Sequence, residues 1–106
     1  MTTSERPSTR FLDVPGARLH YEIRGDDRGA ARRGAPPLVV VGSPMAAAEF
    51  AAVAGAMAGD RTVVTLDPRG YAASRLDDPK GPSTPEIRAD DVAAIIDDMG
   101  ARTADV

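Results

Sequence analysis

The sequence predicts an α/β protein: an antiparallel hairpin, two parallel strands, the start of a third, and two flanking helices. The apolar run 38–41 is typical of a strand that is covered on both faces, and 61–66 repeats a short apolar strand in Thr-Val-Val-Thr-Leu. The alanine-rich segment Ala46 to Ala58 lies between them, which predicts a strand-helix-strand crossover. Ser83-Thr84-Pro85-Glu86 has the composition of a helix start, so a second helix is expected after it.

The composition allows one domain with a thin core. A chain of 106 residues buries roughly 65% of its unfolded surface when it folds. Aromatic residues make up only 4% of the chain and Trp is absent, so Ala and Val must supply most of the packing. Small side chains bury less apolar surface each, and we therefore expect marginal stability.

The charge and the rare residue types exclude several function classes. With 13 basic and 16 acidic residues the net charge is −3, which favours neither nucleic acid nor a membrane surface as a partner. Cys is absent and His20 is the only histidine, so disulfides, zinc sites and a bound cofactor are not expected. No apolar run approaches the length of a membrane span. A soluble cytoplasmic protein is the expectation.

The N-terminal part predicts a short leader and a hairpin. Residues 1–10 are polar and are expected to form a disordered leader, with the folded domain covering 11–106. Leu19, Tyr21 and Ile23 alternate with polar residues, which predicts a strand with one buried face. Pro15-Gly16 suits a type II turn before it.

The two helices are expected to present apolar stripes to the sheet. The stripe of the first helix is predicted to be Phe50, Val53, Ala54 and Met57, with Gly59 ending the helix. That of the second is Val92, Ile95, Ile96 and Met99, with Gly100 at its end. Four carboxylates of the second helix are predicted to face mostly water: Asp90, Asp91, Asp97 and Asp98. The residues after Gly100 are expected to lead into another strand.

Two motifs give the chain a family resemblance over residues 11–106. Val41-Gly42-Ser43-Pro44 looks like a His-Gly-x-Pro oxyanion loop, and Asp67-Pro68-Arg69-Gly70 with Ser74 looks like an Asp-x-Arg-Gly-x-Gly-x-Ser loop. Their order and spacing resemble the N-terminal part of α/β-hydrolase fold enzymes. Val41 stands where the family often has His, and Ala72 where it usually has Gly. A positive φ at Ala72 would be strained.

The resemblance implies a partial site. In the family, the backbone N–H of Ser43, and that of Met45, would stabilise the oxyanion of an acyl intermediate. Asp67 and Arg69 could act as acid or base, but the structural role of bracing their loop is favoured. The family places its Gly-x-Ser-x-Gly nucleophile elbow after the equivalent of Val106, followed by the acid and the His. The chain alone is therefore predicted to be inactive.

The same resemblance implies an open sheet edge and leaves the substrate undecided. The family's strand order (one, two, four, three, five) would leave the strand Leu38 to Val41 exposed, inviting self-association or a complementing chain. An intact relative would act on an ester, an amide or a similar acyl compound, or on an epoxide or halide. A small non-catalytic α/β binding or interaction module is the second hypothesis.

Other candidate residues favour structural roles. His20 is the only possible base, and its place in the alternation predicts a surface residue on the face opposite Leu19 and Tyr21. The adjacent Asp pairs have no calcium-loop spacing and are expected to be solvated, so no metal site is predicted.

Overall fold

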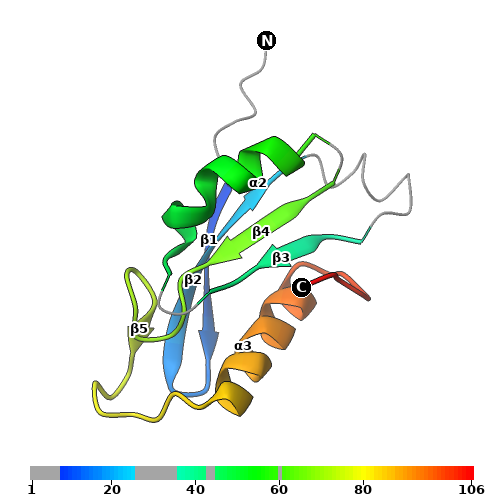
Figure 1. Cartoon of the computed structure of the whole chain (residues 1–106). Coiled ribbons are helices and arrows are strands. Elements are labelled where there is room, and N and C mark those ends of the chain that lie inside the picture. Colours follow the sequence, from blue (N-terminus) through cyan, green and yellow to red (C-terminus); the bar gives the residue numbers. More distant parts are fainter. Residues whose placement is uncertain (1–7, 26–35, 43–44, 60) are drawn as a thin grey trace.

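The computed structural model describes residues 8–25, 36–42, 45–59 and 61–106 (Figure 1). The strands are β1 (Ser8–Val14), β2 (Ala17–Arg24), β3 (Leu38–Val40), β4 (Val63–Leu66) and β5 (Arg75–Leu76). The helical elements are the 3-10 helix η2 (Ala47–Phe50), α2 (Ala51–Met57) and α3 (Pro85–Asp98).

The strands form one mixed sheet with the order β1-β2-β4-β3. β1, β2 and β4 pair antiparallel, and β3 pairs parallel with β4. An isolated parallel bridge joins Leu38 to Asp105, so the start of a third parallel strand is present, as predicted. The sequence did not predict β5, a two-residue strand that pairs with β2. The predicted α/β architecture is confirmed, with β3 at the end of the main path.

The hairpin turns at Pro15-Gly16, where Gly16 has the positive φ of 84° that a type II turn requires. Val14 and Ala17 pair directly across this turn. β1 begins at Ser8, so residues 8–10 belong to the strand and not to the predicted leader. The rest of that predicted leader, residues 1–7, lies outside the described residues.

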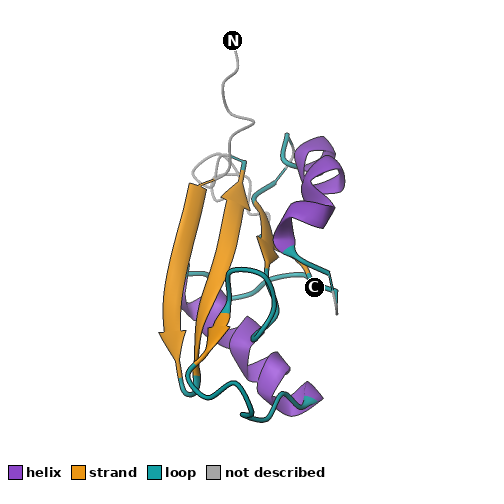
Figure 2. Cartoon of the chain, turned by 90° about the vertical axis from the view of Figure 1, so that its left-hand side faces the viewer, coloured by secondary structure: helices purple, strands orange, loops and turns teal. Residues whose placement is uncertain are grey.

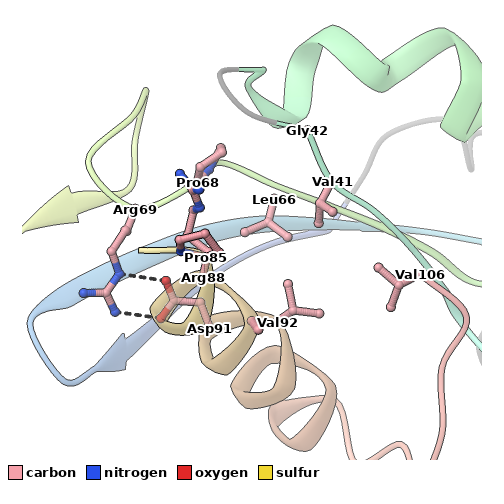
Figure 3. Close-up of a pocket in the computed structure, with 11 residues that line it drawn as sticks. Val41, Gly42, Leu66, Pro68, Arg69, Pro85, Arg88, Asp91, Val92 and Val106 are labelled. Carbon is pink, nitrogen blue, oxygen red and sulfur yellow. Dashed lines mark hydrogen bonds and ion pairs between the residues drawn. The ribbon is translucent and has the colours of Figure 1, made fainter. Parts of the chain in front are cut away.

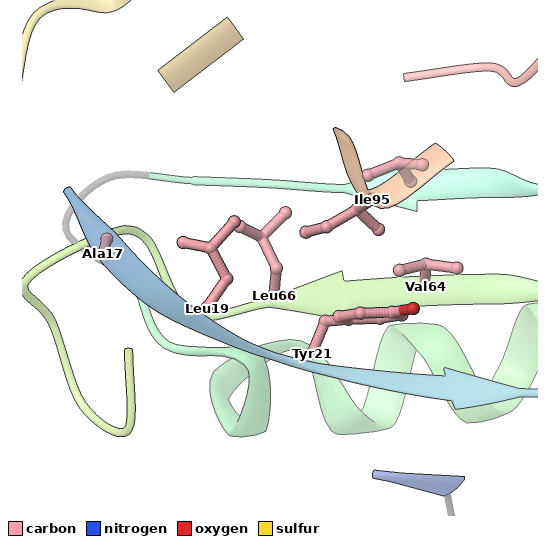
Figure 4. Close-up of a cluster of buried hydrophobic side chains, with 7 residues drawn as sticks. Ala17, Leu19, Tyr21, Val64, Leu66 and Ile95 are labelled. Carbon is pink, nitrogen blue, oxygen red and sulfur yellow. The ribbon is translucent and has the colours of Figure 1, made fainter. Parts of the chain in front are cut away.

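The hydrophobic core lies between the sheet and α3, while α2 covers the other face (Figure 4). Leu19 and Tyr21 from β2, and Val64 and Leu66 from β4, pack with Ile95 of α3. The Tyr21 hydroxyl donates a hydrogen bond to Asp98 on the same helix. Burial, and then this hydrogen bond, raises the pKa of Tyr21 above its usual 10.0. In Figure 2, α2 lies beside the upper part of the sheet and α3 crosses behind its lower part.

The start of α3 follows from its sequence. The Thr84 side chain accepts a hydrogen bond from the Ile87 N–H at 3.2 Å, and Pro85 occupies the first turn. Gly100, with a φ of 77°, follows the end of the helix. The prediction that the helix carboxylates face water was wrong for Asp91, which is buried because it pairs with Arg69.

The first predicted helix is divided into η2 and α2, and its predicted stripe is partly wrong. Val53 is 53% exposed and Met57 is also exposed, whereas Ala47 and Ala54 are the buried residues. Positions seven residues apart lie on one face of a helix, and two alanines there let the backbone approach the sheet closely. Phe50 instead packs over Gly42.

Candidate functional site at the carboxyl end of the sheet

The loops that follow β3 and β4 meet at one edge, because the carboxyl ends of parallel strands lie together. Val41 and Gly42 begin the first loop, and a Cβ on Gly42 would lie 2.8 Å from Cζ of Phe50. A side chain at this position would therefore displace the Phe50 ring. The Met45 N–H donates to the Gly42 carbonyl at 3.2 Å, which closes the turn. Ser43 lies outside the described residues, so its role as an oxyanion donor stays a prediction.

Asp67, the first residue after β4, is a buried acceptor for several donors. Its Oδ1 accepts from the Ala47 N–H at 2.7 Å, and its Oδ2 accepts from the Ala73 N–H at 3.1 Å. Ser74 donates its hydroxyl to the Asp67 carbonyl at 2.6 Å. These contacts are those of a residue that braces its loop, and they join the loop to the start of η2.

His20 contacts the same carboxylate. Its Nδ1 lies 2.8 Å from Oδ2 of Asp67, and the two side chains are only 13% and 4% exposed. The backbone N–H of His20 also donates to the Ser74 hydroxyl at 2.8 Å. The face predicted for His20 is correct, but the prediction of a surface residue was wrong. The pair forms because β2 and β4 align His20 with Asp67, a non-local register that no local motif reports.

Arg69 forms a second buried ion pair beside this network (Figure 3). Its Nε and Nη2 donate to the two carboxylate oxygens of Asp91 at 2.8 and 2.7 Å, and Nη2 also donates to the Pro15 carbonyl at 3.1 Å. The hydrogen bond to Asp91 outweighs desolvation and raises the pKa of Arg69. Arg69 thus ties the loop after β4 to the hairpin turn and to α3.

The remaining motif residues support the same loop. Gly70 has a φ of 78°, and a Cβ there would meet the Leu76 side chain at 3.1 Å. Ala72 has a φ of 49°, which is the left-handed region that the sequence indicated would be strained for this residue. Ser74 is buried, and its hydroxyl accepts from the backbone N–H of His20 on β2 and donates to the carbonyl of Asp67 after β4.

A cavity of about 460 Å³ lies between the carboxyl ends of β3 and β4 and the first half of α3 (Figure 3). This volume is within the range of about 300–1,000 Å³ of small-molecule sites. Its lining is mostly apolar, with the Arg69 and Asp91 pair on one side: Val41, Gly42, Leu66, Pro68, Arg69, Pro85, Arg88, Ala89, Asp91, Val92 and Val106.

The edge of β3 borders this cavity. The Val39 N–H donates to the Asp105 carbonyl at 2.7 Å, and the Asp105 N–H donates to the Pro37 carbonyl at 2.9 Å. Val41 and Val106 are exposed here. Apart from the Asp105 bridge, β3 has no strand partner on this side within the part of the chain that the structure describes.

The described ranges lack a metal site and a membrane-spanning helix. No group of three or more His, Asp or Glu side chains is arranged there to hold a metal ion. None of the helices described has both the length and the apolar character needed to cross a bilayer.

Solved structures share the fold of this chain. An α/β hydrolase fold protein from Burkholderia ambifaria is 20% identical, with a TM-score of 0.69 over 87% of this chain and 31% of its own. A Pseudomonas aeruginosa protein assigned as an epoxide hydrolase is 27% identical, with a TM-score of 0.72 over 89% of this chain and 30% of its own. The chain is thus the N-terminal portion of an α/β-hydrolase fold.

A curated protein agrees with this class. The uncharacterized hydrolase YraK of Bacillus subtilis is 42% identical over 65 residues, which cover 61% of this chain and 21% of the relative. No family model matches the sequence. The chain therefore spans less than a third of the length of these similar proteins.

Proposed function

We propose that this chain supplies the oxyanion loop of an α/β-hydrolase that cleaves an ester or a related acyl compound. The observation that carries the proposal is the tight turn at Gly42, placed at the carboxyl end of parallel strands and beside an apolar cavity. Ligands of open α/β sheets bind at this end of the strands. An epoxide is the second substrate class, because one similar structure is assigned as an epoxide hydrolase.

In this proposal, Ser43 and Met45 present backbone N–H groups to the negative oxygen of the reaction intermediate. Each donor in such a site contributes about 3 kcal/mol to the transition state. The Met45 N–H contact with the Gly42 carbonyl is 3.2 Å, at the long end of the usual range. Oxyanion binding therefore requires the Met45 N–H to share or exchange its contact with the Gly42 carbonyl.

The nucleophile, the acid and the catalytic His belong to the rest of the hydrolase. Asp105 pairs with Leu38 in a parallel bridge, and Gly42 lies four residues beyond Leu38. A strand that continued in this register would bring its fourth residue beyond Asp105 beside Gly42. The strand would cover the edge of β3 and part of the cavity, whether it came from the same polypeptide or from a complementing chain.

A non-catalytic binding module is the alternative, and the apolar cavity favours it. In that case a small apolar ligand would occupy the cavity, and no nucleophile would be needed. For either function we propose the cytoplasm as the location, because the sequence contains no Cys and so needs no oxidising compartment.

The coding sequence that follows the codon for Val106 tests this proposal. The hydrolase function predicts a short apolar run and then a nucleophile elbow, Gly-x-Ser-x-Gly or the same turn with an acidic nucleophile. A reading frame without an elbow, with none in a neighbouring frame, would support the binding module. The isolated chain should hydrolyse an activated ester no faster than a blank of equal purity.

A further inference from the structure

We propose that His20 and Asp67 act as a positioning pair that fixes the backbone on the C-terminal side of the oxyanion turn. The proposal rests on the function proposed above, since the turn at Gly42 gives the pair its purpose. The sequence alone favours a loop-bracing role for Asp67 and a surface position for His20, so it does not pair the two residues. His20 lies on β2, far in sequence from the turn that it would hold.

The donors around Asp67 determine which atom of His20 carries a proton. Oδ2 of Asp67 accepts from the Ala73 N–H and lies 2.8 Å from Nδ1 of His20. An ionised carboxylate can only accept hydrogen bonds, so Nδ1 must be the donor. The pair is therefore a charge-assisted hydrogen bond between side chains that are almost fully buried.

The other oxygen of Asp67 holds Ala47. Oδ1 accepts from the Ala47 N–H at 2.7 Å, and Ala47 is itself buried. Only Ala46 separates this residue from Met45, whose N–H closes the turn on Gly42. Ala46 is held as well, because its N–H donates to Glu49 at 2.7 Å. The backbone that leaves the turn is thus fixed at two consecutive amides.

His20 is needed because it fixes the rotation of the Asp67 carboxylate. Besides His20, Oδ2 accepts only the longer bond from Ala73 at 3.1 Å among the described residues. Without the imidazole, the carboxylate can rotate about its Cβ–Cγ bond and Oδ1 no longer points steadily at Ala47. A displacement near 1 Å at such a position costs up to about 100-fold in rate in an enzyme.

The imidazole ¹⁵N spectrum of the full chain tests the pair without any substitution. We expect the proton of the neutral imidazole to lie on Nδ1, with a hydrogen-bonded resonance protected from exchange. An unprotonated Nδ1, with the proton on Nε2 alone, would overturn the proposal, because that tautomer cannot donate to Asp67.

Amide hydrogen exchange then tests the coupling to Ala47. We expect His20→Ala to speed exchange at the Ala47 amide about 10-fold, the equivalent of losing one hydrogen bond. The Ala58 amide, which donates to the Ala54 carbonyl at the end of α2, is the internal reference. His20→Gln should restore part of the protection, because its amide can donate to Asp67. Phe11→Leu is the matched control, since Phe11 packs beside His20 at 5.2 Å between ring centroids without joining the network.

The outcomes separate this proposal from the proposed function. Equal exchange at Ala47 in His20→Ala and Phe11→Leu would overturn the positioning role, whatever the chain catalyses. If His20→Ala does not fold, the imidazole spectrum of the unsubstituted chain decides the question. A downstream frame without an elbow would remove the hydrolase function, while protonated Nδ1 and faster Ala47 exchange would still establish the pair.

Discussion

The ion pair between Arg69 and Asp91 gives the sharpest stability prediction. Both side chains are nearly fully buried, at 6% and 4% exposure, and the contact uses both carboxylate oxygens. Asp91→Ala would leave the guanidinium buried, with the Pro15 carbonyl as its one remaining hydrogen-bond acceptor among the described residues. Removing one partner of a buried pair costs about 3–5 kcal/mol, a large share of the 5–15 kcal/mol typical of a domain.

Urea unfolding followed by far-UV circular dichroism measures this loss. Asp90→Ala is the matched control, because Asp90 is the exposed neighbour on the same helix and should change the free energy of unfolding by less than about 0.5 kcal/mol. Replacing both partners with apolar residues, Arg69→Met with Asp91→Leu, should recover most of the loss. A cost below about 1 kcal/mol for Asp91→Ala would refute the buried-pair reasoning.

Three further predictions concern single residues. Burial and the Asp98 hydrogen bond raise the pKa of Tyr21 above 10.0 in the folded chain. The neutral Tyr21 hydroxyl therefore stabilises the fold fully below pH 10.0, and this contribution is lost as the pH rises through the folded-state pKa. Urea unfolding below and above that pKa should show a fall in the free energy of unfolding that Tyr21→Phe lacks. Gly42→Ala should destabilise the chain by about 1–3 kcal/mol, since its Cβ would meet Phe50, and Phe50→Leu should relieve the clash in a double variant. Ala72→Gly should raise the thermal midpoint by releasing about 1 kcal/mol of left-handed strain, and an unchanged or lower midpoint would argue against strain there.

The fold was largely predictable because its signals are local. The Pro15-Gly16 turn, the apolar run of β4 and the cap at Thr84 each occupy a few consecutive residues, and each forms the element that it predicts. The apolar stripe of the first helix was not predictable in the same way. Ala54 is buried and Val53 is 53% exposed, so the face of α2 that meets the sheet is not the one that side-chain hydrophobicity selects.

The site was predictable only where a motif spans neighbouring residues. The loop from Asp67 to Ser74 could be recognised from its sequence, but its partners come from elsewhere in the chain. His20 reaches Asp67 through strand pairing, and Asp91 reaches Arg69 through the packing of α3. A carboxylate within a charged helix gives no local sign that it will be buried, so Asp91 was assigned to the surface.

The most direct test of the hydrolase assignment is activity in a chimera. Residues 8–106 would replace the matched N-terminal part of the Pseudomonas aeruginosa protein, and turnover of that protein's own substrate would be compared with the parent and with a Ser43→Pro variant, which lacks the backbone N–H. We predict measurable turnover in the chimera and a loss of about 100-fold or more in Ser43→Pro. A folded chimera without turnover, or one in which Ser43→Pro has no effect, would contradict the role of this chain as the oxyanion-bearing part of a hydrolase.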